Sequence, residues 1–114
     1  MLFDFGQNWL NFSEKALSTD RVLQAKADFQ KLMSGIPLQD KSFLDIGFGQ
    51  GLSILCAVEI GAKVVGCDIN PKCSEVLKQN FKYFPKAANT NIKTFTGSIL
   101  DNSTIEKLQS GFKE

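Results

Sequence analysis

The sequence predicts an α/β protein built on a parallel sheet of three strands that helices cover. Three observations predict this fold. Short apolar runs at 42–46, 63–68 and 91–96 alternate with segments of helical pattern, a glycine cluster follows the first run, and 43% of the 114 residues are hydrophobic. Alternating strands and helices imply parallel pairing with right-handed crossovers, and this apolar content suits a packed core rather than a disordered chain.

Residues 1–36 form the predicted N-terminal helical segment, and residues 37–114 form the predicted α/β unit. Three aromatic residues of the segment follow helical spacing: Phe5, Trp9 and Phe12. This helix either covers a bound ligand or packs on the body of the protein, and packing is the favoured interpretation. A second helix is expected from a cap at 18–20 to Gly35 and Pro37. Its apolar face has four members: Val22, Ala25, Phe29 and Leu32.

The first strand and the helix after it are both expected to be buried. The run at 42–46 is short and largely apolar, which is typical of a parallel strand that is covered on both faces. The apolar segment 52–60 is predicted to be a helix because of its length and because Gly61 follows it. The run at 63–68 then predicts the second strand.

The second half of the α/β unit repeats the alternation. Asn70 and Pro71 predict the start of a helix, because Asn caps helices and Pro fits their first turn. Apolar residues keep helical spacing until Pro85. The run at 91–96, rich in β-branched and aromatic residues, predicts the third strand, and 101–109 predict a short last helix.

The glycine cluster lies at the carboxyl end of the first strand, where open α/β sheets bind their ligands. Gly47, Gly49 and Gly51 permit a tight turn and the close approach of a ligand. The N–H groups and the dipole of the following helix favour an anionic group there. Asp68 ends the second strand, 17 residues after Gly51, and an acid in that place can bind both ribose hydroxyls of a nucleoside. A dinucleotide fingerprint requires a glycine where Leu52 stands.

Three segments resemble the motifs of the class I S-adenosylmethionine-dependent methyltransferases: FLDIGFGQG, VVGCDINP and FTGSILD. The resemblance runs from about residue 42 to 101, roughly half of the chain. It implies a Rossmann-like, three-layer parallel sheet, truncated to strands in the order 3-2-1, and residues 37–114 would be the first half of that domain. The N-terminal segment through FLDIGFGQG also resembles bacterial small-molecule methyltransferases of the ubiquinone-biosynthesis type. The resemblance therefore implies S-adenosylmethionine as the cofactor and a small molecule as the methyl acceptor.

The resemblance also implies roles for individual residues. Gly47, Gly49 and Gly51 would cradle the methionine portion of the cofactor, Asp45 would lie near its amino group and sulfonium, and Asp68 would hold the ribose hydroxyls.

The remaining implied contacts concern the adenine ring and the opening of the site. Ile69 would pack on the adenine, and Ser98 and Ile99 fall where the family contacts that ring. Many members carry an acid at the position of Ser98, so this chain departs from the pattern there. Phe48 replaces a small residue or a cysteine and is expected to narrow the mouth of the site.

Part of the family's fold is missing from the chain, including the strand that pairs beside the first strand and carries a substrate-side motif. No catalytic residue is identified, and the 114 residues alone are expected to give little or no turnover. The unpaired edge at 43–46, from Phe43 to Ile46, predicts self-association as a homo-oligomer or pairing with another chain, because apolar strand edges recruit partners.

The composition of the chain argues against several kinds of partner and site. A net charge of +1 without a basic patch argues against nucleic acid as a partner, and no apolar run is long enough to cross a membrane. The chain has no histidine, and its three cysteines match no metal-ligand spacing, so no metal is expected. Reduced thiols and the lack of a signal peptide predict a cytoplasmic protein. The alternatives are a nucleotide- or NAD-binding oxidoreductase domain and a non-catalytic binding or assembly module.

Overall fold

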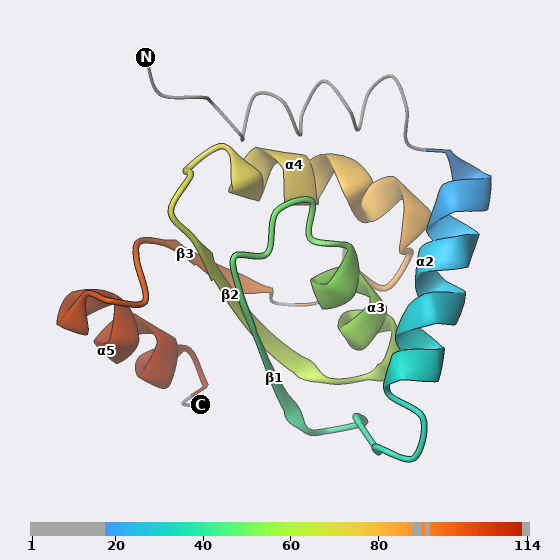
Figure 1. The fold of residues 1–114 in the computed structure, drawn as a ribbon, viewed down its shortest axis with the longest axis horizontal. Helices are drawn as coiled ribbons and strands as arrows, with labels where there is room; N and C mark the ends of the chain where they lie inside the picture. The colour runs from blue at the N-terminus through green and yellow to red at the C-terminus, as the bar shows by residue number, and fades with distance from the viewer. Residues whose placement is uncertain (1–17, 88–89, 91, 113–114) are drawn as a thin grey trace.

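The computed structural model describes residues 18–87, 90 and 92–112, so the predicted helix with Phe5, Trp9 and Phe12 lies outside the described residues. Strands and helices alternate along the described chain (Figure 1). The elements, in order, are α2 (Thr19–Leu32), β1 (Ser42–Ile46), α3 (Leu52–Ile60), β2 (Lys63–Asp68), α4 (Cys73–Gln79), the 3₁₀ helix η1 (Asn80–Tyr83), β3 (Lys93–Thr96) and α5 (Asn102–Gly111).

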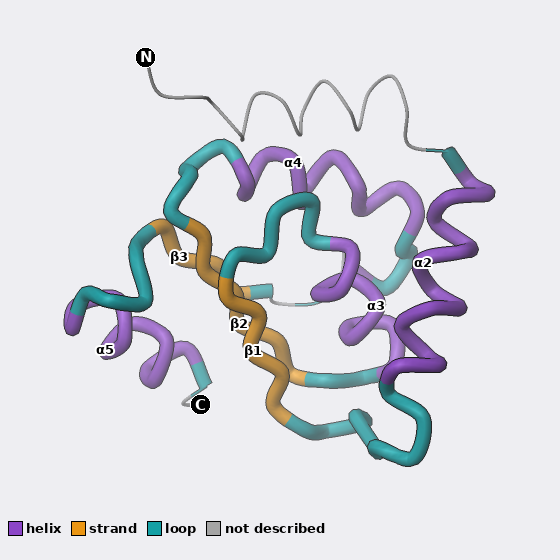
Figure 2. Tube along the Cα trace, viewed as in Figure 1, coloured by secondary structure: helices purple, strands orange, loops and turns teal. Residues whose placement is uncertain are grey.

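The sheet is parallel and has the strand order β1-β2-β3, with β2 in the centre (Figure 2). Leu44 of β1 lies opposite Val65 of β2, and Val65 lies opposite Lys93 of β3. A helix separates each pair of consecutive strands in the sequence. These findings confirm the predicted α/β class and the 3-2-1 order, and they bring the carboxyl ends of all three strands to one edge of the sheet.

Helices cover the two faces of the sheet unequally. On one face α3 packs against β1 and β2, with α2 outside it, and on the other face α5 packs against β2 and β3 (Figure 1). Successive residues of β2 therefore enter different cores, Val64 the larger one on the α3 side and Val65 the smaller one on the α5 side. Leu108 of α5 completes the smaller core.

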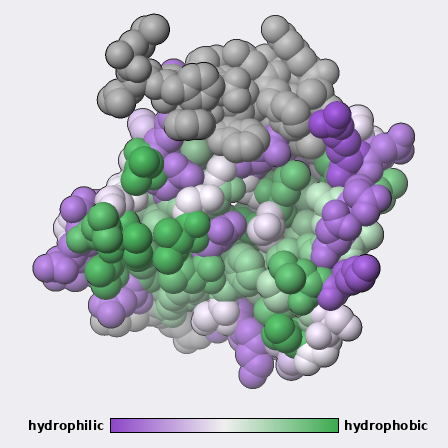
Figure 3. Space-filling model, viewed as in Figure 1, coloured by the Kyte–Doolittle hydropathy of each residue, from purple (hydrophilic) through white to green (hydrophobic). Residues whose placement is uncertain are grey.

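The expectation that β1 is buried on both faces is wrong. Phe43 and Asp45 are half-buried on the α3 side, whereas Leu44 is 43% and Ile46 50% exposed. The cause is the position of α5, which lies over β2 and β3 rather than over β1. Figure 3 shows apolar surface gathered on the side of the molecule where α5 lies beside the sheet.

The helix boundaries differ from the sequence-based expectations in informative ways. The Ser18 side chain accepts a hydrogen bond from the Arg21 N–H at 3.3 Å, as the predicted cap requires, but Leu32 is exposed because it lies in the last turn of α2. The Asn70 side chain accepts a hydrogen bond from the Lys72 N–H at 3.0 Å, so Asn70 closes a local turn and α4 begins only at Cys73. Within the described ranges, no helix is both long and apolar enough to cross a bilayer.

Candidate functional site

The glycine turn between β1 and α3 is built from backbone that favours glycine. Gly47, Gly49 and Gly51 have φ angles of +73°, +55° and +79°. Two features disfavour a side chain at Gly51. Its φ is left-handed, and an added Cβ would overlap the Leu77 side chain of α4. The Gly51 N–H donates to the Phe48 carbonyl at 2.8 Å, which closes the turn directly before α3.

Asp68 reaches the turn from the end of β2. Its Oδ2 accepts a hydrogen bond from the Gly49 N–H at 3.2 Å, and its Oδ1 accepts one from the Asn70 N–H at 3.0 Å. A carboxylate has about four lone-pair positions, so acceptor capacity remains for further donors. The turn and the carboxylate that the sequence singled out therefore meet at one point of the sheet edge.

Asp45 adds a second carboxylate close to the first. Burial, and then the negative charge of Asp68, raise the pKa of Asp45 above its ordinary value of 3.8. Both causes disfavour the ionised form of Asp45, and a cation placed beside the two carboxylates would stabilise that form. The pair therefore suits a positively charged group of a ligand.

The end of β3 completes this edge. The Gly97 N–H donates to the Asp68 carbonyl at 3.0 Å, which places the segment after β3 beside the end of β2. Ser98 is half-buried, and its hydroxyl oxygen accepts a hydrogen bond from the Leu100 N–H at 3.1 Å. Ile69 is 74% and Ile99 37% exposed, so both offer apolar surface at the rim.

Phe48 does not narrow the opening of the site, contrary to the expectation. Its side chain is 7% exposed and belongs to the larger core. A Cβ added to Gly66 in β2 would lie 3.0 Å from the Phe48 ring, so the missing side chain of Gly66 makes room for Phe48 beneath the turn. A glycine inside a strand is a recognised signal of such close approach, but sequence reasoning did not use it.

Asn80 is a second residue that sequence reasoning missed. It is fully buried, and its Nδ2 donates to the Gln50 carbonyl of the turn at 3.0 Å. A signal was present, because Asn80 is polar yet continues the helical spacing of the buried Cys73, Val76 and Leu77.

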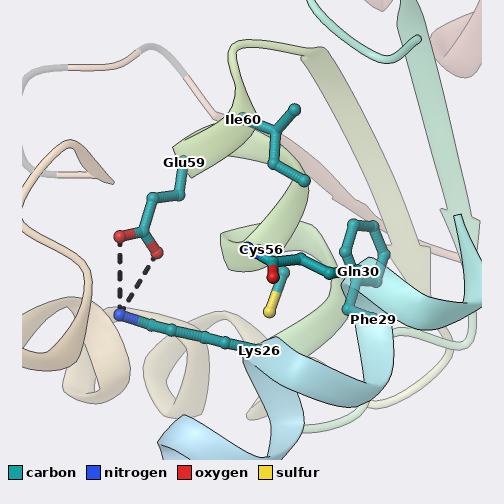
Figure 4. A pocket seen from close by; sticks show the side chains of 6 residues that line it. All are labelled: Lys26, Phe29, Gln30, Cys56, Glu59 and Ile60. Atoms are coloured by element: carbon teal, nitrogen blue, oxygen red, sulfur yellow. Dashed lines mark hydrogen bonds and ion pairs between the residues drawn. The ribbon is translucent and has the colours of Figure 1, made fainter. Parts of the chain in front are cut away.

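A small hollow of about 150 Å³ lies elsewhere, between α2 and the second half of α3 (Figure 4). Lys26 is engaged there: its Nζ lies 3.2 Å from Glu59 Oε2, donates to the Tyr83 carbonyl and stands 4.6 Å from the centre of the Phe84 ring. Burial raises the pKa of the neighbouring Cys56 thiol to about 11, so the thiol stays protonated at neutral pH. The hollow is also smaller than common ligand pockets, which favours the sheet edge as the candidate site.

Among the described residues, no group of three or more metal-ligating side chains is present. The geometry at the sheet edge instead combines a backbone turn, two carboxylates and an apolar rim. Such an edge can hold a ligand that carries a cation, hydroxyl donors and a flat apolar group.

No family model matches the chain. Among curated proteins, one provisionally named as a protein N5-glutamine methyltransferase of Methanocaldococcus jannaschii is 39% identical over 70 residues, which are 60% of this chain and 34% of that protein. The ribosomal protein L11 methyltransferase of Colwellia psychrerythraea is 41% identical over 49 residues, which are 42% of this chain and 17% of that protein. The chain therefore spans about a third or less of the length of these relatives.

Two solved structures share the fold. A provisionally named S-adenosylmethionine-dependent methyltransferase of Methanococcus maripaludis matches 89% of this chain and 46% of its own, with a TM-score of 0.65 and 15% identity. A provisionally named RNA methyltransferase of Pyrococcus horikoshii matches 66% of this chain and 37% of its own, with a TM-score of 0.53 and 23% identity. At these identities the likeness concerns the arrangement of strands and helices.

Proposed function

We propose that the chain binds S-adenosylmethionine at the carboxyl edge of the sheet as part of a class I S-adenosylmethionine-dependent methyltransferase. Its similarity to a methyltransferase in sequence and to another in fold supports the proposal. One observation carries the proposal: the Gly49 N–H of the turn donates to the Asp68 carboxylate. The two elements that recognise different parts of one adenosine-containing ligand thus lie within hydrogen-bond distance of each other.

The turn and the two carboxylates are proposed to hold the polar parts of the cofactor. Gly47, Gly49 and Gly51 cradle the methionine portion, where a side chain would obstruct the ligand or Leu77. Asp45 lies near the amino group and the sulfonium, and these cations offset the repulsion between the two carboxylates. Asp68 uses its remaining lone pairs for the ribose hydroxyls.

The rim is proposed to bind the adenine ring. Ile69 packs against one face of the ring, as its exposed apolar side chain permits. Ser98 and Ile99 line the other side of this subsite, and the Ser98 hydroxyl is a weaker partner for the adenine amino group than an acid would be. When bound, the cofactor supplies an electrophilic methyl group, and the residues of this chain orient that group and exclude water from it.

The proposal also concerns the methyl acceptor. A small molecule is the acceptor that the sequence motifs suggested, whereas the names of two curated relatives specify proteins as acceptors. We favour a protein acceptor for this reason. The test measures tritium transfer from methyl-labelled S-adenosylmethionine into separated protein, RNA and small-molecule fractions, catalysed by the complete methyltransferase of which the chain is proposed to be part. Label confined to the RNA or small-molecule fraction would contradict a protein acceptor.

The partner proposal concerns β1. Within the described residues β2 is its one neighbouring strand, and Leu44 and Ile46 are half-exposed beside the free edge. We retain the proposal that this edge pairs with a second copy of the chain, since an apolar strand edge is prone to association.

Calorimetric titration with S-adenosylhomocysteine tests the proposed cofactor site. We expect the wild type to bind and Asp68→Ala to lose about 100-fold in affinity, because two charge-assisted hydrogen bonds to the ribose are removed. Asp101→Ala is the matched control, since Asp101 is exposed and its side chain makes no capping hydrogen bond at the start of α5. NAD is titrated in parallel. Binding of NAD in place of S-adenosylhomocysteine would indicate an oxidoreductase domain, and binding of neither ligand would refute the proposal.

A further inference from the structure

Asn80 connects the 3₁₀ helix η1 to the middle of the glycine turn. Its side chain is fully buried, and its Nδ2 donates to the carbonyl oxygen of Gln50 at 3.0 Å. Gln50 lies between Gly49 and Gly51, and both of these glycines have left-handed backbone. One side chain, 30 positions away in the sequence, therefore holds the centre of the turn.

This contact holds a peptide group of the turn whose glycine neighbours would otherwise give it wide conformational freedom. The peptide that joins Gln50 to Gly51 is held at both ends, because its N–H donates to the Phe48 carbonyl and its carbonyl accepts from Asn80. A glycine-rich turn has more conformational freedom to lose than any other backbone. Fixing it before the ligand arrives lowers the entropy lost on binding, which is the general benefit of preorganisation.

Packing alone does not account for an asparagine at this position. The buried Oδ1 of Asn80 has no hydrogen-bond partner among the protein groups that the structure describes. The amide orientation is set by the Gln50 carbonyl, since the reverse orientation would place two oxygens against each other. A leucine would fill a similar volume without burying an unpaired polar atom. The specific contribution of Asn80 is therefore its donated hydrogen bond.

We propose that Asn80 is a positioning residue that holds the glycine turn in the geometry required for the cofactor. The inference rests on the proposed function. It concerns how the turn is preorganised rather than which groups touch the ligand.

The test compares Asn80→Leu with Val76→Ala in the full 114-residue chain. Val76 is a fully buried residue of α4, so its truncation weakens the same part of the core. For Asn80→Leu we expect a urea midpoint close to that of the wild type, about a tenfold loss of S-adenosylhomocysteine affinity, and faster hydrogen exchange at the Gly49 and Gly51 amides. For Val76→Ala we expect a lower midpoint with unchanged affinity of the folded protein.

Wild-type affinity and wild-type exchange at both glycine amides in Asn80→Leu would overturn the proposal. If Asn80→Leu loses as much stability as Val76→Ala, Asn80→Ala is compared with Val76→Ala, since both then leave a cavity. Equal affinity in that pair would also overturn it. If the wild type itself fails to bind S-adenosylhomocysteine, the proposed function is refuted, and the exchange rates still decide whether Asn80 holds the turn.

Discussion

Gly51→Ala is expected to be the most damaging single-methyl change in the turn. The new side chain would have to occupy a left-handed backbone with φ of +79°, which costs roughly 1 kcal/mol relative to glycine. Its Cβ would also overlap Leu77, a buried residue of α4, and overpacking of this kind costs roughly 1–3 kcal/mol. We expect a loss of about 3 kcal/mol in the free energy of unfolding, measured by urea denaturation.

Gly35→Ala separates the two contributions. Gly35 has a similar φ of +82°, but an added Cβ would meet no atom within 4 Å. This variant is therefore expected to lose only about 1 kcal/mol, the conformational part of the cost. In a Leu77→Ala background the overlap disappears, and Gly51→Ala should then cost about as much as Gly35→Ala.

The reasoning fails if Gly51→Ala and Gly35→Ala lose the same free energy of unfolding in the wild-type background. Such a result would mean that the Leu77 side chain, or α4 with it, moves away from the new methyl group at little cost.

Three further outcomes follow from the electrostatics and the exposed surface. Because burial and Asp68 raise the pKa of Asp45 above 3.8, this side chain holds more protons in the folded than in the unfolded chain between 3.8 and its raised pKa. The stability of the fold therefore falls as the pH rises through that window and levels off above it. Asp45→Asn is therefore expected to be more stable than the wild type in urea unfolding at pH 7 and equally stable below about pH 3, while its affinity falls more for cationic S-adenosylmethionine than for S-adenosylhomocysteine. An unchanged stability at pH 7 would contradict the proposed repulsion. Leu44→Lys should reduce self-association in light scattering at high concentration, and a wild type that is monomeric there would remove the partner proposal. Cys56, whose pKa is about 11, should resist iodoacetamide at pH 8 in the folded chain and react in urea; rapid labelling without urea would show that the core opens locally.

Sequence reasoning succeeded where the chemistry is local. The turn at 47–51 needs glycines for its backbone, and Asp68 stands at a strand end that the parallel alternation places beside that turn. The spacing of residues was sufficient for this, because the carboxyl ends of parallel strands share one edge. Alternation also predicted the positions of the three strands to within two residues, and the family resemblance predicted the sheet order.

The errors concern contacts between distant segments. Two-sided burial of β1 depends on what covers each of its faces, and α5 covers only β2 and β3. Phe48 turns inward because Gly66, on another strand, leaves space for its ring. Asn80 and Gln50 are 30 positions apart in the sequence and meet only through tertiary packing, so the local sequence pattern does not predict their hydrogen bond.

At the carboxyl edge of the sheet, main-chain hydrogen bonds rather than side chains link the outer strands to β2. Gly47 donates its N–H to the Cys67 carbonyl at 2.7 Å, and Gly97 donates its N–H to the Asp68 carbonyl at 3.0 Å, so each outer strand is fastened to β2 just beyond its last residue. Neither bond depends on the identity of a rim side chain, and residues such as Ile69 and Ile99 can therefore be exchanged to suit a different ligand while the frame stays in place. Proline is the one amino acid that would cut either fastening, because it has no N–H to donate.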